Sequence, residues 1–171
     1  DKGKVCALVT SSISWAMAKY DFPDVVEVCG DISPMPIGFC LSKSSQDLKG
    51  RLDAFLKDYL ENTDLEAVNS DWADPNSTRE MPRPDEVIDP VGTLRIATCA
   101  IFPPYDFIRN GEVVGCEAEI LARFAISENM RWEFMDVAFA GLINCIQSGK
   151  ADIGSSIISI TPERQHSVDF S

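Results

Sequence analysis

The stretch that decides the fold is residues 149–171, GKADIGSSIISITPERQHSVDFS, which is typical of a strand, a turn and a helix. Residues 151–158 are apolar and rich in Ile, which suits a strand buried on both faces. Thr161 can cap a helix whose first turn contains Pro162, a position that needs no N–H donor. Arg164 then follows the free amides of the helix start. Amides, a hydroxyl and a guanidinium can together bind a carboxylate or phosphate, although a surface helix with an exposed arginine gives the same pattern.

Upstream of this stretch, residues 93–148 predict further alternation of strands and helices. TLRIAT and RWEFMD are typical of strands, Asn110-Gly111 is a hairpin turn signal, and two segments place apolar residues on one helical face. The expected strands are 93–98, 112–114 and 131–136, and the expected helices are 117–129 and 139–148. Strands and helices in this order predict an α/β fold with a mostly parallel sheet and right-handed crossovers.

The first part of the chain alternates less regularly. The expected strands are 5–9, 25–29 and 37–42, and the expected helices are one that ends near residue 20, then 44–60 and 63–72. Residues 73–91 contain four prolines and no apolar period. This composition predicts a flexible linker.

The composition is that of an acidic globular protein. The chain has 171 residues, 45% of them hydrophobic, with a net charge of −12. Nucleic-acid binding is excluded because it requires a basic face. No apolar run reaches the roughly 18 residues of a membrane-spanning helix, and no signal-peptide pattern precedes the first expected strand. We therefore expect a cytoplasmic protein or a part of a longer exported one.

The cysteines and the single histidine predict neither a metal site nor a cofactor. None of the six cysteines has CxxC spacing, and His166 cannot complete a zinc site alone. Most cysteines lie in apolar runs, which indicates free buried thiols, with one or more disulfides as the alternative. Neither a Ser-His-Asp nor a paired-carboxylate pattern occurs, and nothing pairs Cys99 with His166. The sequence therefore predicts no enzyme.

Six motifs in residues 93–171 resemble the first third of type II periplasmic solute-binding proteins, family three, the amino-acid-binding type of ABC transporters. They are LRIAT, FPPYDF, G-x-x-x-G-x-E, FAGLI, QSGKADI and SITPER. Residues 1–72 resemble the last third of such a protein, so the order is inverted. The chain is then either a stretch across the junction of a tandem array or a circularly permuted lobe.

This resemblance implies a three-layer αβα lobe, with one antiparallel strand crossing a mostly parallel sheet. It divides the chain into a strand–helix–strand remnant of lobe two (1–34), the C-terminal strand and helices of lobe one (35–72), a linker (73–91) and the N-terminal βαβαβ part of lobe one (92–171).

The resemblance also implies a ligand site at the carboxyl ends of the strands. Phe102 and Phe139 would sandwich the ligand side chain. Four residues of the opening stretch, Ser156, Ser159, Thr161 and Arg164, would hold its carboxylate. Ser11 matches a lobe-two position that commonly carries the acid for the ligand's ammonium, and Cys99 stands where many members have an acid or another polar residue.

The function implied is that of an extracellular or periplasmic receptor fragment, membrane-tethered in its full-length parent, that binds an amino acid or similar small carboxylate. Its partners would be this small-molecule ligand and an ABC importer or a membrane sensor. The alternative is a lobe that binds no ligand and forms a homodimer through unpaired strand edges. A dehydratase-like enzyme on the same fold is the third hypothesis.

Overall fold

The computed structural model describes residues 24–28 and 35–171, and the chain forms two units, Asp1–Met35 and Pro36–Ser171. In the first unit, residues 25–28 are exposed and form no strand, so the predicted strand at 25–29 is wrong over these residues. Val28 is 85% exposed and contributes nothing to a core. The expected strand at 5–9, the helix ending near residue 20, Ser11, Cys6 and Cys29 lie outside the described residues.

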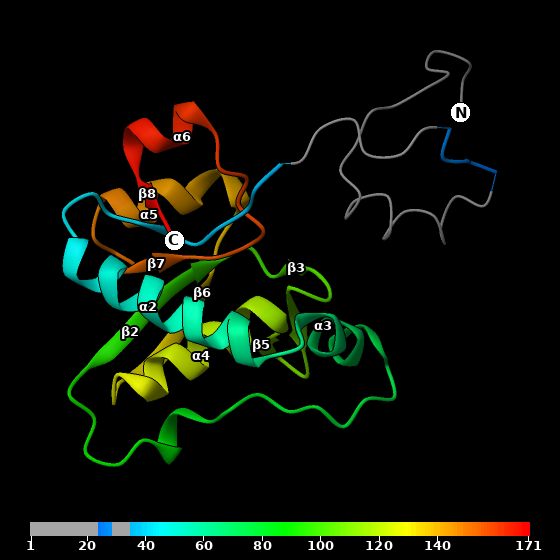
Figure 1. The fold of residues 1–171 in the computed structure, drawn as a ribbon, viewed down its shortest axis with the longest axis horizontal. Coiled ribbons are helices and arrows are strands. Elements are labelled where there is room, and N and C mark those ends of the chain that lie inside the picture. Colours follow the sequence, from blue (N-terminus) through cyan, green and yellow to red (C-terminus); the bar gives the residue numbers. More distant parts are fainter. Residues whose placement is uncertain (1–23, 29–34) are drawn as a thin grey trace. The chain divides into compact units, whose positions relative to one another are not determined.

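The second unit is built on a sheet of five strands in the order β6-β2-β7-β1-β8, counted over the described residues (Figure 1). β2 is parallel to both β6 and β7, whereas β1 is antiparallel to β7 and to β8. The prediction of a mostly parallel sheet with one antiparallel strand is therefore confirmed. The strands are β6 Arg131–Asp136, β2 Thr93–Thr98, β7 Ile153–Gly154, β1 Cys40–Leu41 and β8 Asp169–Phe170.

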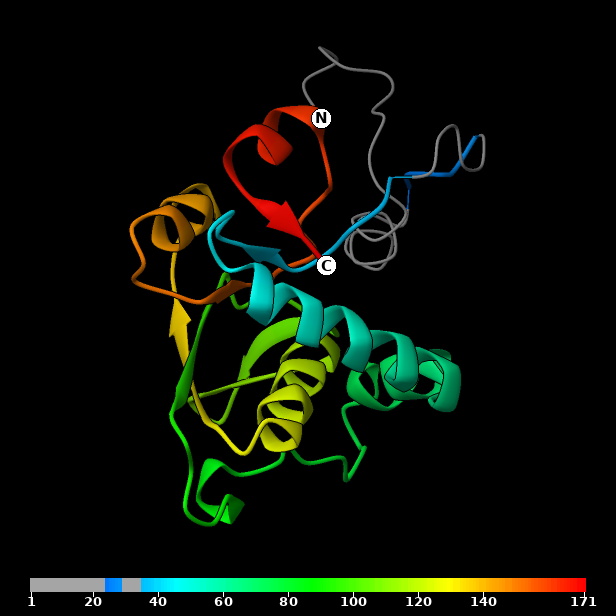
Figure 2. The same ribbon diagram turned by 60° about the vertical axis from the view of Figure 1, so that its left-hand side comes forward.

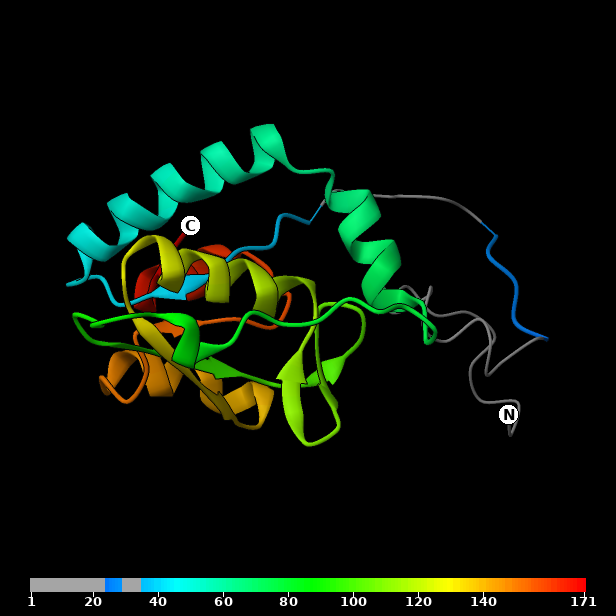
Figure 3. The same cartoon turned by 90° about the horizontal axis from the view of Figure 1, so that it is seen from below.

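Helices cover both faces of this sheet, which gives three layers (Figure 3). Alternate side chains of a strand point to opposite faces, so Ile96 of β2 joins the core under α2 and α4, while Ala97 joins the core under α5. Leu52 of α2 and Phe124 of α4 are fully buried on the first face. The helices are α2 Gln46–Asn62, α3 Leu65–Ala73, α4 Cys116–Ser127, α5 Leu142–Gln147 and α6 Pro162–Ser167.

A small second sheet follows β2, in the order β3-β4-β5. Its strands are β3 Ile101–Phe102, β4 Asp106–Arg109 and β5 Glu112–Val114. Asn110 and Gly111 join β4 to β5 with φ angles of 54° and 84°. Positive φ at both central residues is what this hairpin turn requires, so the turn predicted at these two residues is confirmed.

The strand expected at 37–42 is limited to Cys40–Leu41, and two further predicted elements are also shorter in the structure. The strand expected at 151–158 is paired only at Ile153–Gly154, because Ser156 and Ile157 have positive φ angles that no extended strand adopts. The helix expected at 139–148 divides at Gly141 into a 3₁₀ turn, η2 Phe139–Gly141, and α5. Both changes place irregular backbone at the end of the sheet where the ligand site was expected.

Residues before and after the linker build one sheet. β1 lies between β7 and β8 (Figure 2), and Ile37 adds an isolated bridge to Ser159. Above them α2 packs on α4, with the rings of Phe55 and Phe124 5.5 Å apart. The short strand β1 is thus the antiparallel strand that the resemblance implied.

The segment predicted as a flexible linker is bound to the folded unit. Arg79 donates from Nε and Nη2 to the fully buried carboxylate of Glu119, at 2.7 and 2.9 Å. Trp72 donates from its indole to the same carboxylate at 2.8 Å. Further along, Val87 is buried beside the short 3₁₀ helix η1 Pro84–Glu86, and Met81 packs on the core. A composition rich in proline and charge conceals these anchors, which tie residues 79–87 to α4 and the core.

Candidate functional site

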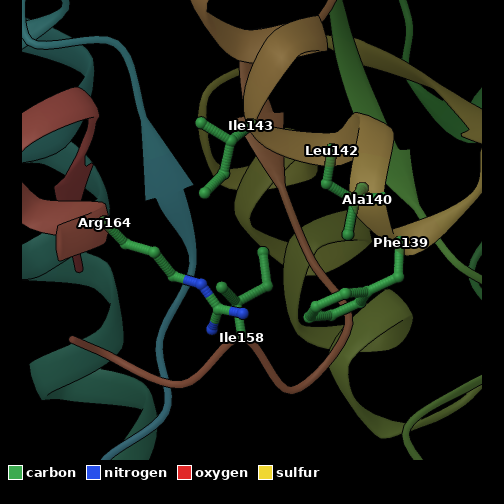
Figure 4. Close-up of a pocket in the computed structure, with 6 residues that line it drawn as sticks. All are labelled: Phe139, Ala140, Leu142, Ile143, Ile158 and Arg164. Carbon is green, nitrogen blue, oxygen red and sulfur yellow. The ribbon is translucent and has the colours of Figure 1, made fainter.

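A pocket of about 210 Å³ opens on the α5 side of the sheet, near the carboxyl ends of its parallel strands. Figure 4 shows the Arg164 guanidinium and the Phe139 ring converging above Ile158. The lining residues come from η2, α5, α6 and the turn after β7; they are Phe139, Ala140, Leu142, Ile143, Ile158 and Arg164. Five of the six are apolar, so Arg164 provides the charge of the pocket.

Arg164 is aimed into the pocket by the start of α6. Thr161 caps this helix, as predicted, and accepts a hydrogen bond from the backbone N of Arg164 at 3.3 Å. The arginine Nη1 donates to the carbonyl of Ser159 at 2.8 Å, and its guanidinium carbon lies 5.4 Å from the centroid of the Phe139 ring. Its other guanidinium nitrogens have no hydrogen-bond acceptor within the part of the chain that the structure describes, so they are available to a ligand.

The two aromatic residues of the predicted sandwich touch each other. Their ring centroids are 6.5 Å apart at an interplanar angle of 78°, which is an edge-to-face contact. Phe139 is 36% exposed and lines the pocket, whereas Phe102 is half-buried in the cluster beneath it. A ligand can contact the face of Phe139 as the rings stand, but a position between the two rings requires them to separate.

Of the hydroxyl-bearing residues of the predicted site, Ser156 and Thr161 use their hydroxyl groups within the protein, and Ser159 uses its carbonyl. Ser156 is fully buried and donates from Oγ to the carbonyl of Cys99 at 3.0 Å. Thr161 caps α6, and the carbonyl of Ser159 accepts from Arg164. All three lie beside the pocket without lining it. Two of the predicted site residues, Phe139 and Arg164, therefore line the pocket directly, and Ser11 is outside the described residues.

A buried polar cluster holds the backbone that leads into the pocket. One oxygen of Glu117, Oε2, accepts from Ser155 Oγ and from the backbone N atoms of Ser156 and Ile157, each at 2.9 Å. The two amides belong to residues with φ of 122° and 45°. Because Ile158 follows directly, Glu117 fixes the turn that places the floor of the pocket.

The second carboxyl of this cluster is Asp106, which is fully buried. Its Oδ2 lies 2.7 Å from Ser155 Oγ. Burial, and next the nearby Glu117 charge, raise the pKa of Asp106 well above its usual range. Ser155 has one hydroxyl proton, so a protonated Asp106 that donates to Ser155 lets Ser155 donate to Glu117, while Asp106 Oδ1 has no partner among the described residues.

Sequence reasoning assigned no role to Asp106 or Glu117. Glu117 is the last residue of the motif G-x-x-x-G-x-E. The surroundings of Gly115, two residues before it, explain why the motif has a glycine at that position. Gly115 has a φ of 129°, and a Cβ there would collide with the carbonyls of Pro104 and Tyr105. These carbonyls accept from the backbone N atoms of Cys116 and Glu117. The motif is therefore the sequence signal from which a structural role of Glu117 could have been predicted.

The described residues hold no other constellation of functional type. No group of three or more metal-ligating side chains occurs among them, and none of their helices is both long and apolar enough to cross a membrane. The described cysteines are unpaired, as expected: Cys40, Cys99 and Cys116 are buried, and Cys145 is half-buried. Burial raises the pKa of Cys40 to about 12, which makes it an inert core thiol.

A mostly parallel sheet covered on both faces, with a pocket near its strand ends, defines an α/β ligand-binding lobe. Residues 94–171 match the family of bacterial extracellular solute-binding proteins, family 3. The resemblance found in the sequence motifs is thereby confirmed.

Individual amino-acid-binding proteins are similar to part of the chain. A probable histidine-binding protein of Campylobacter jejuni is 31% identical over 78 residues, which are 46% of this chain and 30% of the relative. The arginine-binding extracellular protein ArtP of Bacillus subtilis is also 31% identical over 78 residues, 31% of its own length. The solved structure of an ancestral arginine-binding protein bound to arginine is 41% identical, with 47% of this chain and 36% of that chain covered and a TM-score of 0.43. The matched part of the chain spans about a third of the length of these relatives.

Proposed function

We propose that this chain is part of an extracellular solute-binding receptor and that its pocket binds the carboxylate of an amino acid or similar small molecule. The observation that carries the proposal is the position of Arg164. Its guanidinium keeps donors free at the mouth of an apolar pocket and stands over the ring of Phe139. Charge-assisted bonds from arginine to a carboxylate are among the strongest polar contacts in proteins.

The family supports the chemical class of the ligand. The curated relatives are named for histidine and arginine, which share an α-carboxylate and differ in their side chains. The whole protein acts outside the cytoplasmic membrane, tethered to it, and presents its ligand to an ABC importer or a membrane sensor. Its role is binding without chemistry on the ligand.

The proposal has a consequence for affinity. Receptors of two lobes close over their ligand through a hinge, whereas this pocket covers a ligand from one side. We therefore expect dissociation constants in the millimolar range, on the order of 4 kcal/mol of binding free energy.

The test is a titration of the 171-residue chain with L-arginine, L-histidine and L-leucine, followed by calorimetry and by NMR. We expect weak binding that Arg164→Gln abolishes. The matched control is Arg131→Gln, which removes the same charge from an exposed position on the edge strand β6. Binding that persists in Arg164→Gln, or an equal loss in the control, would show that the site is elsewhere.

A second candidate function is self-association through an open strand edge. Among the described residues β8 pairs on one side only, with β1, and lies at the end of the sheet. An edge of this kind can pair with a second copy of the chain. The mass of the chain, measured by sedimentation over a hundredfold range of concentration, separates this role from a monomeric binding lobe.

A further inference from the structure

The turn between β7 and α6 shapes the pocket through two of its residues. Ile158 is almost fully buried and lines the pocket, and the carbonyl of Ser159 accepts from Arg164 Nη1 at 2.8 Å. The two residues before them, Ser156 and Ile157, have φ angles of 122° and 45°. Such angles are strained for residues other than glycine and persist only where the surrounding structure holds them. The geometry of the pocket therefore depends on the contacts that hold these two residues.

Glu117 is the residue that makes those contacts. Its Oε2 accepts from the backbone N atoms of Ser156 and Ile157 and from Ser155 Oγ, each at 2.9 Å. Hydrogen bonds to an ionised acceptor are roughly twice as strong as neutral ones, so the charge of Glu117 stabilises the turn. The Ser155 hydroxyl also lies 2.7 Å from Asp106 Oδ2. Two carboxyl groups, one on α4 and one on β4, therefore compete for a single hydroxyl group.

The contacts as they stand require a proton on one of the two carboxyl groups. The hydroxyl of Ser155 has one proton and cannot donate to two carboxylates at once. Glu117 accepts from two amides, so the additional proton belongs to Asp106, which then donates to Ser155. An ionised Asp106 would place two like charges around one donor at a fully buried position, which is strongly unfavourable.

The surroundings of Asp106 favour its protonated form. Burial, and next the charge of Glu117, raise its pKa well above the usual range. Two hydroxyl groups, those of Ser155 and of Thr98 on β2, lower the pKa without offsetting this rise. Within the described ranges, 24–28 and 35–171, no cation contacts Asp106 or Glu117.

The other titratable side chains around the pair stay neutral or are paired elsewhere. Burial raises the pKa of Cys116, at the start of α4, to about 12, and it also raises the pKa of Tyr105, which precedes β4. Arg79 influences Cys116, but it binds Glu119 at 2.7 Å, and this second glutamate lies on another face of α4. Asp106 is therefore the member of the cluster that gains or loses a proton as the pH changes.

We infer that Asp106 and Glu117 are positioning residues for the ligand pocket, and that the pocket binds tightly only while Asp106 carries its proton. Loss of this proton leaves Ser155 between two carboxylates, loosens the hold of Glu117 on the turn, and shifts the residues that line the pocket. The inference rests on the proposed function, because it concerns the same Arg164 site, and it adds control of that site by pH. Affinity is then full at low pH and falls as the pH rises through the pKa of Asp106, by at most about tenfold per pH unit for one proton.

The test is calorimetric titration of the full chain with L-arginine and L-leucine from pH 5 to pH 9. We expect the affinity of the parent to fall at least about tenfold over this range, because one proton is lost. Asp106→Asn should abolish this pH dependence, since its side-chain amide donates to Ser155 at every pH. The matched control, Asp58→Asn, makes the same change at an exposed position of α2 and should keep the pH profile of the parent. Each ligand is used with all three proteins, so its own titration cancels.

Two further readouts distinguish positioning from a general loss of stability. NMR of the ¹⁵N-labelled chain without ligand should show the amide signals of Ser156 and Ile157 moving with pH in the parent and not in Asp106→Asn. Glu117→Gln, which removes the charge that holds the turn, should weaken binding already at pH 5. Affinity that Glu117→Gln leaves unchanged contradicts its role in positioning.

The outcomes separate the inference from the proposed function. A flat pH profile in the parent, or the same slope in Asp106→Asn, overturns the inference; if Arg164→Gln abolishes binding at pH 5, the carboxylate site stands. If neither amino acid binds the parent at any pH, or if Arg164→Gln binds as the parent does, the proposed function and the inference both fail.

Discussion

Helix α4 buries two glutamates, Glu117 and Glu119, in two very different surroundings. Glu119 is met by cations: Arg79 contacts both of its oxygens, Arg123 donates at 2.7 Å, and Trp72 adds an indole N–H. Glu117 contacts a hydroxyl, two backbone amides and a second carboxyl, and no cation contacts it within the part of the chain that the structure describes. In the Glu119 cluster, arginines neutralise the buried charge. In the Asp106–Glu117 cluster, hydrogen bonds from a hydroxyl and two amides stabilise the charge of Glu117, and Asp106 carries a proton.

The difference appears in how the acids respond to burial. Burial raises the pKa of Glu119, but the hydrogen bonds from Arg79, Trp72 and Arg123 outweigh it and hold the pKa below its usual range. For Asp106, burial and the charge of Glu117 act in the same direction, and the pKa is raised. The Glu119 cluster therefore serves attachment of the linker, while the Asp106–Glu117 cluster shapes a turn at the ligand pocket.

The largest effect is expected from Glu119→Ala, which leaves Arg79 with Asp71 as its remaining ion-pair partner and the buried indole of Trp72 without its acceptor. Removal of one partner from a buried pair costs about 3 kcal/mol, at the low end of the usual range because Arg79 and Arg123 are partly exposed. Denaturant unfolding measures this loss of stability. Glu61→Ala, at an exposed position in α2, is the control and should change stability by less than about 0.5 kcal/mol.

A double-mutant cycle with Arg79→Ala isolates the pair itself. We expect a coupling energy of about 1–3 kcal/mol between Glu119 and Arg79. If the two single losses are additive, the linker is not held by this ion pair, and the contrast between the two clusters disappears.

A smaller effect is expected from Glu117→Gln, which keeps the shape of the side chain. The three donors that bond to Oε2 then meet a neutral carbonyl oxygen in place of a carboxylate oxygen, so the hydrogen bonds lose their charge assistance and a loss of about 2 kcal/mol follows. Hydrogen exchange is the sharper readout, because the amides of Ser156 and Ile157 should exchange faster while those of β2 are unaffected. Uniformly faster exchange would contradict a local role.

The smallest change in stability at acid pH is expected from Asp106→Asn, and its pH dependence is the most informative of these tests. The folded-state pKa of Asp106 lies above its unfolded value, so its contribution to stability is complete below the unfolded pKa, roughly 3.9, and is lost as the pH rises through the folded pKa. Asparagine mimics the protonated acid and should remove this loss. Thermal unfolding from pH 4 to pH 9 should show the variant gaining on the parent as the pH rises.

Glu119 provides the opposite pH dependence within the same molecule. Its folded pKa is lowered, so its contribution is present above the unfolded pKa and is lost as the pH falls through the folded value. The Glu119→Gln variant should therefore be less stable than the parent at neutral pH, and this difference in stability should become smaller as the pH falls. If both variants changed in the same direction with pH, the distinction between a cation-paired and a proton-sharing cluster would be wrong.

Much of the fold could be predicted from sequence because it depends on periodic patterns. β2 and β6 begin and end at the predicted residues, and α2 and α3 lie within two residues of their predicted bounds. Arg164 and its cap Thr161 could also be recognised, since Thr-Pro-Glu before a helix is a local signal.

The rest depends on contacts between distant residues. β7 is short because Glu117 binds the amides that follow it, and no local pattern announces that bond. Arg79 was assigned to a linker because proline and charge surround it, whereas its partner Glu119 is buried in a helix far along the chain. The identity of an acidic residue does not show whether it is buried or exposed, so neither cluster could be predicted without the structure.

The placement of β1 has a consequence for biosynthesis. This strand, Cys40–Leu41, is translated well before both of its partners, Ile153–Gly154 and Asp169–Phe170. A ribosome must therefore release the residues between these strands before β1 can pair on either side, and pairings between such distant residues form slowly. Until then the apolar strand stays uncovered, which makes the nascent chain a client for chaperones.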